Sequence, residues 1–267
     1  MTLAAKLDSA YDGIAEEYTK SKDLPFRIYV ERPTLLKLIG SSMINKRVLD
    51  LACGSGYYSR LYRDKMRASF VYGVDISKSM IDIAESMECP NTSRIRYKVM
   101  NVGEMDVAEP IDHLEKFDVV SAAYLLCYAK SPDELLRFCE VIASNLKDGG
   151  KLFMLNDNPN AAYTVHQRKK YALAKSIPDG GFNPTDGDTI QYELTNTDGS
   201  IASFNNVWWP LTTYEWALRQ AGFTSWRWVR MELDGNAGQD PLYWSEFLEN
   251  CPIIALEATK GRPTVDQ

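Results

Sequence analysis

The sequence predicts an α/β fold with a mostly parallel sheet that is covered by helices on both faces. Between residues 47 and 156, short apolar segments alternate with segments of helical periodicity. A glycine loop, residues 50–56, joins the first apolar segment to the helix after it. Strands as apolar as these are buried on both faces, which is typical of parallel sheets whose strands are connected by helices.

Several segments have the apolar content and the length of strands. They are residues 47–51, 70–76, 95–100, 117–126, 151–156, 226–232 and 253–260. Helical segments separate the first five, whereas the last two follow one another after a helix at 214–221. This order predicts that the N-terminal strands are parallel.

Capping residues mark the starts of three helices. Ser77 precedes a segment with apolar residues at helical spacing, where a serine accepts a hydrogen bond from the first turn. Residues 131–134, SPDE, predict a capping box with proline at the first helical position, and the helix is expected to reach Leu146. Thr212 and Glu215 predict a second capping box.

We interpret the chain as a single domain, residues 1–267, with three parts. Residues 46–156 and 211–260 form the core, and residues 1–45 form an N-terminal helical lid. Residues 157–210 are an inserted segment that covers the functional site.

The insertion carries three local signals. A helical pattern is expected near residues 161–175, and a loop rich in glycine, proline and aspartate spans 178–188. The segment 189–209 alternates between apolar and polar residues around Asp198-Gly199, which predicts a β-hairpin.

Composition excludes several classes of function. The formal net charge is −6 and the longest basic run is residues 168–170, so no surface for a nucleic-acid backbone is expected. No segment has the apolar length of a signal peptide or a membrane span. The five cysteines form no CxxC pair, which indicates reduced thiols in the cytoplasm.

The glycine loop and Asp75 indicate a cofactor that contains a nucleoside. Asp75 ends the second strand, nineteen residues after Gly56, where a carboxylate accepts hydrogen bonds from both hydroxyls of a ribose. A dinucleotide fingerprint has a third glycine at the position that Ser59 occupies here. Asp50 would repel a pyrophosphate and suits an ammonium group, so the loop favours S-adenosylmethionine over NAD.

Six segments resemble, in order and spacing, the class I S-adenosylmethionine-dependent methyltransferases, in particular the branch that acts on small molecules. They are DLACGSG, GVDIS, FDVVSAAYLL, LKDGG, AGF and LEATK, within residues 8–156 and 211–260. The resemblance implies a Rossmann-like sheet of seven strands with the last strand antiparallel. It also implies S-adenosyl-L-methionine as cofactor and S-adenosyl-L-homocysteine as product. YDGIAEEYTKSKDLPFR and TYEWALRQAGF further resemble azapteridine N-methyltransferases.

The resemblance places the cofactor along the glycine loop, the end of the second strand and the lid. Asp75 would hold the ribose, and Asn101, where many relatives have Asp, would lie at the adenine edge. Arg27 is the expected partner of the methionine carboxylate, because a guanidinium matches carboxylate geometry. The expected cofactor-binding residues are Tyr11, Tyr18, Arg27, Asp50, Ala52, Cys53, Gly54, Gly56, Tyr57, Tyr58, Asp75, Ile76, Met80, Asn101, Val102, Ala123 and Tyr124.

The opening segment resembles the lid of small-molecule members, in which tyrosines close over the cofactor. Tyr11 and Tyr18 are seven residues apart and are expected on one face of a helix. A helix that only packs on the sheet is the alternative.

Acceptor-binding residues are expected after the fourth and fifth strands and in the insertion. They are Tyr124, Asn156, Asp157, Tyr163, Trp208 and Trp209. In-line displacement needs positioning more than a base, so no catalytic residue is assigned. Tyr18, His166 and Asp157 are the candidates for a base, with a surface or structural role as the alternative for His166. Matching ligands around Asn156-Asp157 are not evident, so no metal is expected.

The expected function is transfer of a methyl group to nitrogen or oxygen of a small, planar heteroaromatic or phenolic metabolite in secondary metabolism. The expected partner is this small-molecule acceptor, with no nucleic acid and no membrane, and the protein is expected to be a monomer or homodimer. A methyltransferase that acts on a macromolecule and a non-catalytic, regulatory protein that binds the cofactor are the alternatives.

Overall fold

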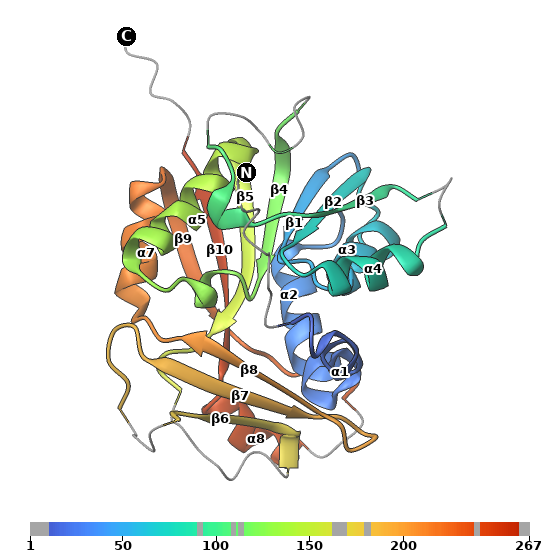
Figure 1. Cartoon of the computed structure of the whole chain (residues 1–267), viewed down its shortest axis with the longest axis vertical. Helices are drawn as coiled ribbons and strands as arrows, with labels where there is room; N and C mark the ends of the chain where they lie inside the picture. Colours follow the sequence, from blue (N-terminus) through green and yellow to red (C-terminus); the bar gives the residue numbers. More distant parts are fainter. Residues whose placement is uncertain are drawn as a thin grey trace, which may run out of the picture.

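The large sheet contains seven strands in the order β3-β2-β1-β4-β5-β10-β9 (Figure 1). The computed structural model describes residues 11–89, 93–107, 111, 115–161, 170–178, 183–237 and 241–261. The strands are β1 (Arg47–Leu51), β2 (Phe70–Asp75), β3 (Ile95–Val99), β4 (Phe117–Ala123), β5 (Leu146–Asp157), β9 (Phe223–Arg230) and β10 (Ile253–Lys260). The first five are parallel, and β10 is antiparallel to both β5 and β9. The predicted mostly parallel sheet with its last strand antiparallel is confirmed.

Helices pack against the sheet in two apolar clusters. The helices are α1 (Ala15–Lys20), α2 (Arg32–Ile39), α3 (Tyr57–Asp64), α4 (Lys78–Ser86), α5 (Pro132–Asn145), α7 (Leu211–Gln220) and α8 (Pro241–Glu249). One cluster contains Tyr62 of α3 and Met80 of α4, and the other contains Ile142 of α5 and Leu218 of α7. None of the helices in the described part of the chain has the length and apolar character needed to span a membrane.

Two predicted helix caps are confirmed. Ser77 Oγ accepts a hydrogen bond from the Met80 N–H at 3.2 Å, which caps α4. Ser131 Oγ accepts one from the Glu134 N–H at 3.1 Å, which caps α5. Each cap satisfies a donor that the first helical turn leaves without an intrahelical partner.

The capping box predicted at Thr212 is wrong. α7 begins at Leu211, after Pro210, and has no side-chain cap. The Glu215 carboxylate instead accepts a hydrogen bond from the Trp228 indole at 3.0 Å. The Glu215 side chain, which the capping-box pattern predicts to bond a backbone N–H at the start of the helix, therefore makes a tertiary contact instead.

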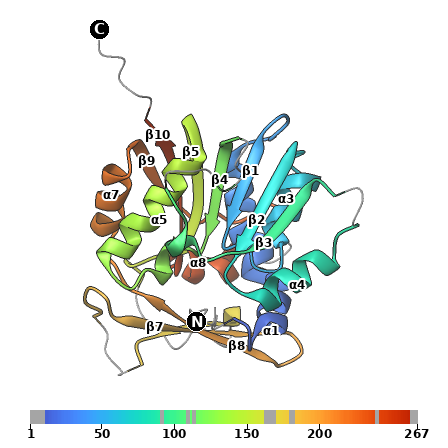
Figure 2. The same cartoon turned by 45° about the horizontal axis from the view of Figure 1, so that its top comes forward.

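A smaller antiparallel sheet lies across one end of the large sheet, with α1 beside the start of β8 (Figures 1 and 2). Its strands are β6 (Leu173–Ser176), β7 (Thr189–Thr195) and β8 (Ile201–Val207). β7 and β8 confirm the predicted hairpin. The helical pattern expected near 161–175 is wrong at its C-terminal end, because residues 173–176 form β6. Residues 162–169 lie outside the described residues.

The opening segment is not one continuous helix. α1 begins at Ala15, and the residues from Tyr11 to Ile14 form a turn before it. The expectation that Tyr11 and Tyr18 share one helical face is therefore wrong. A five-residue π-helical turn, Arg27–Glu31, follows and leads directly into α2.

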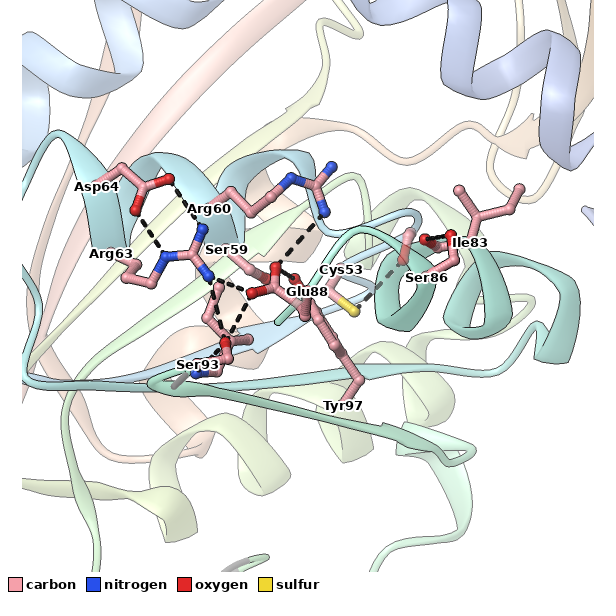
Figure 3. A network of polar contacts seen from close by, with 12 residues as sticks. Cys53, Ser59, Arg60, Arg63, Asp64, Ile83, Ser86, Glu88, Ser93 and Tyr97 are labelled. Carbon is pink, nitrogen blue, oxygen red and sulfur yellow. Dashed lines mark hydrogen bonds and ion pairs between the residues drawn. The ribbon is translucent and has the colours of Figure 1, made fainter. Parts of the chain in front are cut away.

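A polar network holds α3, the helix that follows the glycine loop (Figure 3). Arg63 of α3 forms an ion pair with Glu88, which lies just after α4. Arg60, also on α3, approaches the same carboxylate at 4.0 Å, and Ser93 Oγ donates a hydrogen bond to it at 2.7 Å. The network thereby connects α3 to the segment between α4 and β3.

Candidate functional site

A pocket of about 620 Å³ lies beside the carboxyl ends of β1, β2 and β4. Ligands bind outside the carboxyl ends of the strands in open α/β sheets. The residues that were expected to bind the cofactor and that line the pocket are Tyr11, Tyr18, Ala52, Gly54, Asp75, Ile76, Met80, Asn101, Val102, Ala123 and Tyr124. The pocket therefore brings the lid, the glycine loop and three strand ends together.

The glycine loop adopts the left-handed backbone that its sequence permits. Gly54 has φ +54° and Gly56 has φ +78°, a region that glycine enters without steric cost. Ala52, which is not a glycine, has φ +54° and lines the pocket. Such strained residues concentrate at binding sites, where the surrounding structure holds them in place.

The Asp75 carboxylate is fixed by backbone donors. Oδ2 accepts a hydrogen bond from the Gly54 N–H at 2.8 Å, and Oδ1 accepts one from the Ser77 N–H at 2.9 Å. Burial raises the pKa of Asp75, and these backbone hydrogen bonds act in the opposite direction. A carboxylate of set orientation therefore lines the pocket at the end of β2.

Other residues of the glycine loop lie just outside the pocket. Asp50 is buried and accepts a hydrogen bond from Ser59 Oγ. Burial raises its pKa to about 6, although hydrogen bonds from Ser59 and Ser121 and the charge of Lys22 lower it. Expected cofactor residues that do not line the pocket are Arg27, Asp50, Cys53, Gly56, Tyr57 and Tyr58.

The lid is closed against the rest of the site. The hydroxyls of Tyr11 and Tyr128 are hydrogen-bonded, and the rings of Tyr11 and Tyr18 meet edge to face at 4.8 Å. Asp12 Oδ1 accepts a hydrogen bond from Ser77 Oγ at 2.6 Å, which ties the turn before α1 to the segment after Asp75. The two tyrosines thus meet over the pocket, although the predicted helical spacing is not what brings them together.

The basic residues after α1 are buried in different surroundings. The Arg27 guanidinium is paired with Glu31 at 2.8 Å. The Lys22 ammonium forms no hydrogen bond or ion pair with any residue that the structure describes, and it lies 4.8 Å from the centroid of the Tyr18 ring. Burial and the charge of Arg27 lower the pKa of Lys22 to about 7, while Asp50 among other acidic groups raises it. The sequence interpretation did not single out Lys22.

The hairpin β7–β8 contributes the wall opposite the strand ends. Gln191, Ser203, Phe204 and Asn205 line the pocket. Phe204 belongs to a group of aromatic residues in the C-terminal half that the sequence offers for stacking on a planar acceptor, with a place in the core as the alternative. The other three were not expected, because the alternation of the sequence predicts the hairpin but not which face meets the site. Further lining residues that the sequence interpretation missed are Met100, Leu125, Tyr128, Lys130, Glu134 and Phe138.

The expected tryptophan wall is displaced from the pocket. The Trp209 indole donates a hydrogen bond to the Ala129 carbonyl at 2.8 Å, and Trp209 is buried in the cluster around α5 and α7. The Trp208 indole donates one to the Pro159 carbonyl at 3.3 Å. Neither residue lines the pocket.

The expected acceptor residues after β5 are also buried away from the pocket. Asp157 forms an ion pair with Lys175 at 2.8 Å and accepts a hydrogen bond from Tyr192. Asn156 is fully buried and does not line the pocket either. Tyr163 and His166 lie outside the described residues. No group of three or more potential metal ligands occurs in the part of the chain that the structure describes.

Comparisons with known proteins identify the family. A family model described as a methyltransferase domain matches residues 27–227. N-demethylindolmycin N-methyltransferase from Streptomyces griseus is 27% identical over 66% of this chain and 68% of its own length. Ubiquinone biosynthesis O-methyltransferase from Coxiella burnetii is 30% identical over 51% of each protein, so the chain spans about half the length of this relative.

The fold agrees with that family. The structure of an S-adenosylmethionine-dependent methyltransferase from Mesorhizobium loti resembles this one with a TM-score of 0.60 at 16% identity, covering 90% of this chain and 100% of that chain. The strand order with its antiparallel β10 and the pocket beside the glycine loop are consistent with this assignment. The chain therefore belongs to the methyltransferase-domain family, and it has the fold of the class I S-adenosylmethionine-dependent methyltransferases.

Proposed function

We propose that the protein transfers the methyl group of S-adenosylmethionine to a nitrogen or oxygen atom of a small, planar heteroaromatic or phenolic metabolite. The observation that carries the proposal is the pocket of about 620 Å³ between the glycine-loop side and the hairpin β7–β8. A volume of this size is typical of sites for small organic ligands. The lid and the hairpin both line the pocket, which favours a small acceptor over a macromolecule.

The residues that line the pocket fit the cofactor. Asp75 would accept hydrogen bonds from the ribose, and Asn101 and Val102 would lie at the adenine edge. Asp75 at the pocket wall and Asp50 just outside it supply negative charge near the glycine loop, where a cationic amino acid would bind. S-adenosylmethionine supplies a methyl group on a positively charged sulfur, which makes the methyl carbon open to attack by a nucleophile.

The contribution of the chain is to position the acceptor and to exclude water. Burial raises the pKa of Tyr18 and, to well above its usual value, that of Tyr124. Both side chains are therefore phenols near neutral pH, and neither takes a proton from the acceptor. An acceptor atom that needs no base from these two side chains is a neutral ring nitrogen or an oxygen that has already lost its proton.

Phe204 is the residue on which a planar acceptor would stack. Its ring is stacked on Tyr192 at 5.6 Å with an interplanar angle of 7°, so it is held from behind. Its other ring neighbours are Tyr18, edge to face at 5.6 Å, and Tyr11, tilted by 33° at 5.8 Å. The carboxamides of Gln191 and Asn205 flank it on the pocket wall and would hydrogen-bond the polar edge of a heteroaromatic ring.

Transfer of labelled methyl groups to a panel of heteroaromatic and phenolic compounds tests the proposal. The resemblance to toxoflavin synthase, an azapteridine N-methyltransferase, places azapteridines first in that panel. We expect transfer to at least one compound, and Phe204→Ala should raise the KM for it about tenfold through loss of stacking.

Trp208→Ala is the matched control, because it removes an aromatic ring from the same strand region without touching the pocket. Its KM should stay within about twofold of wild type. Transfer only to a protein or RNA, or binding of the cofactor without any transfer, would overturn the proposed function.

A further inference from the structure

We propose that the buried Arg27–Glu31 ion pair is a positioning device for Tyr18 and Tyr124, the tyrosines through which the lid and the end of β4 line the pocket. The inference rests on the proposed function and deepens it. It assigns Arg27 to the placement of the reactants and not to the methionine carboxylate, the role that the resemblance implied.

The ion pair is removed from water. Arg27 is 3% exposed and Glu31 is 0% exposed, and Arg27 Nη1 lies 2.8 Å from each carboxylate oxygen. Taking two charges out of water costs several kcal/mol, so a buried pair is often no more stabilising than apolar residues of the same size. A gain in folding stability alone therefore does not account for the pair.

Both carboxylate oxygens of Glu31 are used to hold tyrosines. Oε1 accepts a hydrogen bond from the Tyr58 hydroxyl at 2.6 Å, and Oε2 accepts one from the Tyr124 hydroxyl. The Arg27 guanidinium lies 5.5 and 5.6 Å from the ring centroids of Tyr18 and Tyr124. One ion pair thus connects α3, the end of β4 and the lid.

Two departures from regular backbone meet at this ion pair. Arg27 and Glu31 are the first and last residues of the π-helical turn, and such turns are rare and occur mostly near functional sites. Tyr124 has φ +64°, which is unfavourable for a residue with a bulky side chain. The hydrogen bond from its hydroxyl to Glu31 anchors the far end of a side chain whose backbone is strained.

The contact with Glu31 does not make Tyr124 a base. Burial, and next the negative charge of Glu31, raise the pKa of Tyr124 well above its usual value. The hydroxyl therefore keeps its proton and donates a hydrogen bond to the carboxylate. What the residue offers the reaction is a fixed position, and a misplacement of about 1 Å is enough to slow a positioned reaction about a hundredfold.

Tyr58 provides a matched control for the experiment. Tyr58→Phe and Tyr124→Phe each remove one hydroxyl from the same carboxylate, but only Tyr124 lines the pocket. With an acceptor found in the panel, Tyr124→Phe should lower kcat about tenfold with little change in the cofactor Kd, and Tyr58→Phe should stay within about twofold.

A double-mutant cycle tests whether Glu31 acts through Tyr124. The effect of Glu31→Gln on kcat should largely disappear in the Tyr124→Phe background and persist in the Tyr58→Phe background. Equal effects of the two tyrosine variants, or the same effect of Glu31→Gln in both backgrounds, would show a merely structural role and overturn the proposal.

Glu31→Gln leaves a buried guanidinium unpaired and is open to loss of folding. The variant Arg27→Gln with Glu31→Gln avoids this, and its crystal structure with S-adenosylhomocysteine gives a readout independent of activity. The proposal expects the Tyr124 ring to leave its place in the pocket wall, and an unmoved ring would contradict it. If wild type transfers no methyl group, the proposed function fails and this structure still decides the positioning role.

Discussion

Replacing Asp75 by Ala is expected to weaken the binding of S-adenosylmethionine by about 1–3 kcal/mol, because charge-assisted hydrogen bonds to the ribose hydroxyls are lost. The Asp75 carboxylate lines the pocket, and the N–H groups of Gly54 and Ser77 hold both of its oxygens. Little reorganisation is therefore needed when a ligand binds. Titration calorimetry with S-adenosylmethionine and S-adenosylhomocysteine measures the change.

Asp82→Ala is the control for this variant. Asp82 lies on α4, shortly after Asp75 in the chain, but it is exposed, and its ion-pair partner among the described residues is Lys78 at 2.6 Å. The Asp82→Ala substitution removes the same charge as Asp75→Ala from a nearby part of the protein without changing a pocket residue. If folded Asp75→Ala and Asp82→Ala both bind the cofactor as wild type does, Asp75 has no part in the site.

Asp50→Asn is expected to separate stability from binding. The pKa of Asp50 is raised by burial to about 6, above its ordinary value, so the folded protein holds this proton more tightly than the unfolded chain. The stability from this group is present at low pH and is lost as the pH rises through about 6. Asp50→Asn should therefore melt at a higher temperature than wild type above pH 6 and close to it near pH 4.

Cofactor binding should respond in the opposite sense. An ammonium group beside Asp50 favours the ionised carboxylate, so the Kd of wild type should rise about tenfold per pH unit as the pH falls below 6. At pH 7.5, Asp50→Asn should bind S-adenosylmethionine about tenfold more weakly, with a flatter pH profile. The charge of Lys22 lowers the pKa of Asp50 and the charge of Asp75 raises it, so this carboxylate responds to nearby charges. Asp82→Asn, which removes a charge outside the pocket, is the control for a general change in net charge. A profile for Asp50→Asn that parallels wild type would remove Asp50 from the site.

The sequence predicts most of the sheet because the strands depend on local pattern. The segments 47–51 and 253–260 match β1 and β10 to the residue, and Ser77 and Ser131 cap their helices as expected. α8 escaped prediction because no cap or periodic pattern marks it clearly. β6 escaped because its strand character depends on pairing with β7.

The candidate site could be predicted only where backbone geometry determines it. The glycine loop and Asp75 lie in the pocket as a consequence of the β1 and β2 ends meeting at one sheet edge. The part of the pocket that the hairpin β7–β8 lines depends instead on which face of the hairpin meets the lid. Phe204 therefore lines the pocket, whereas the Trp209 indole donates a hydrogen bond to the Ala129 carbonyl outside it. Arg27 carried one usable signal, an acidic residue four positions later, which predicts an ion pair on a helical turn.

The pocket is expected to bind S-adenosylmethionine, and titration calorimetry of the wild-type protein tests this most directly. S-adenosylmethionine and S-adenosylhomocysteine should both bind at a single site, because the loop lacks the third glycine of a dinucleotide site and two acidic side chains supply negative charge beside it. NAD should bind poorly or not at all, since its pyrophosphate would meet the Asp75 carboxylate and would be repelled by the charge of Asp50 just outside the pocket. Binding of NAD with no response to either adenosyl compound would contradict the account.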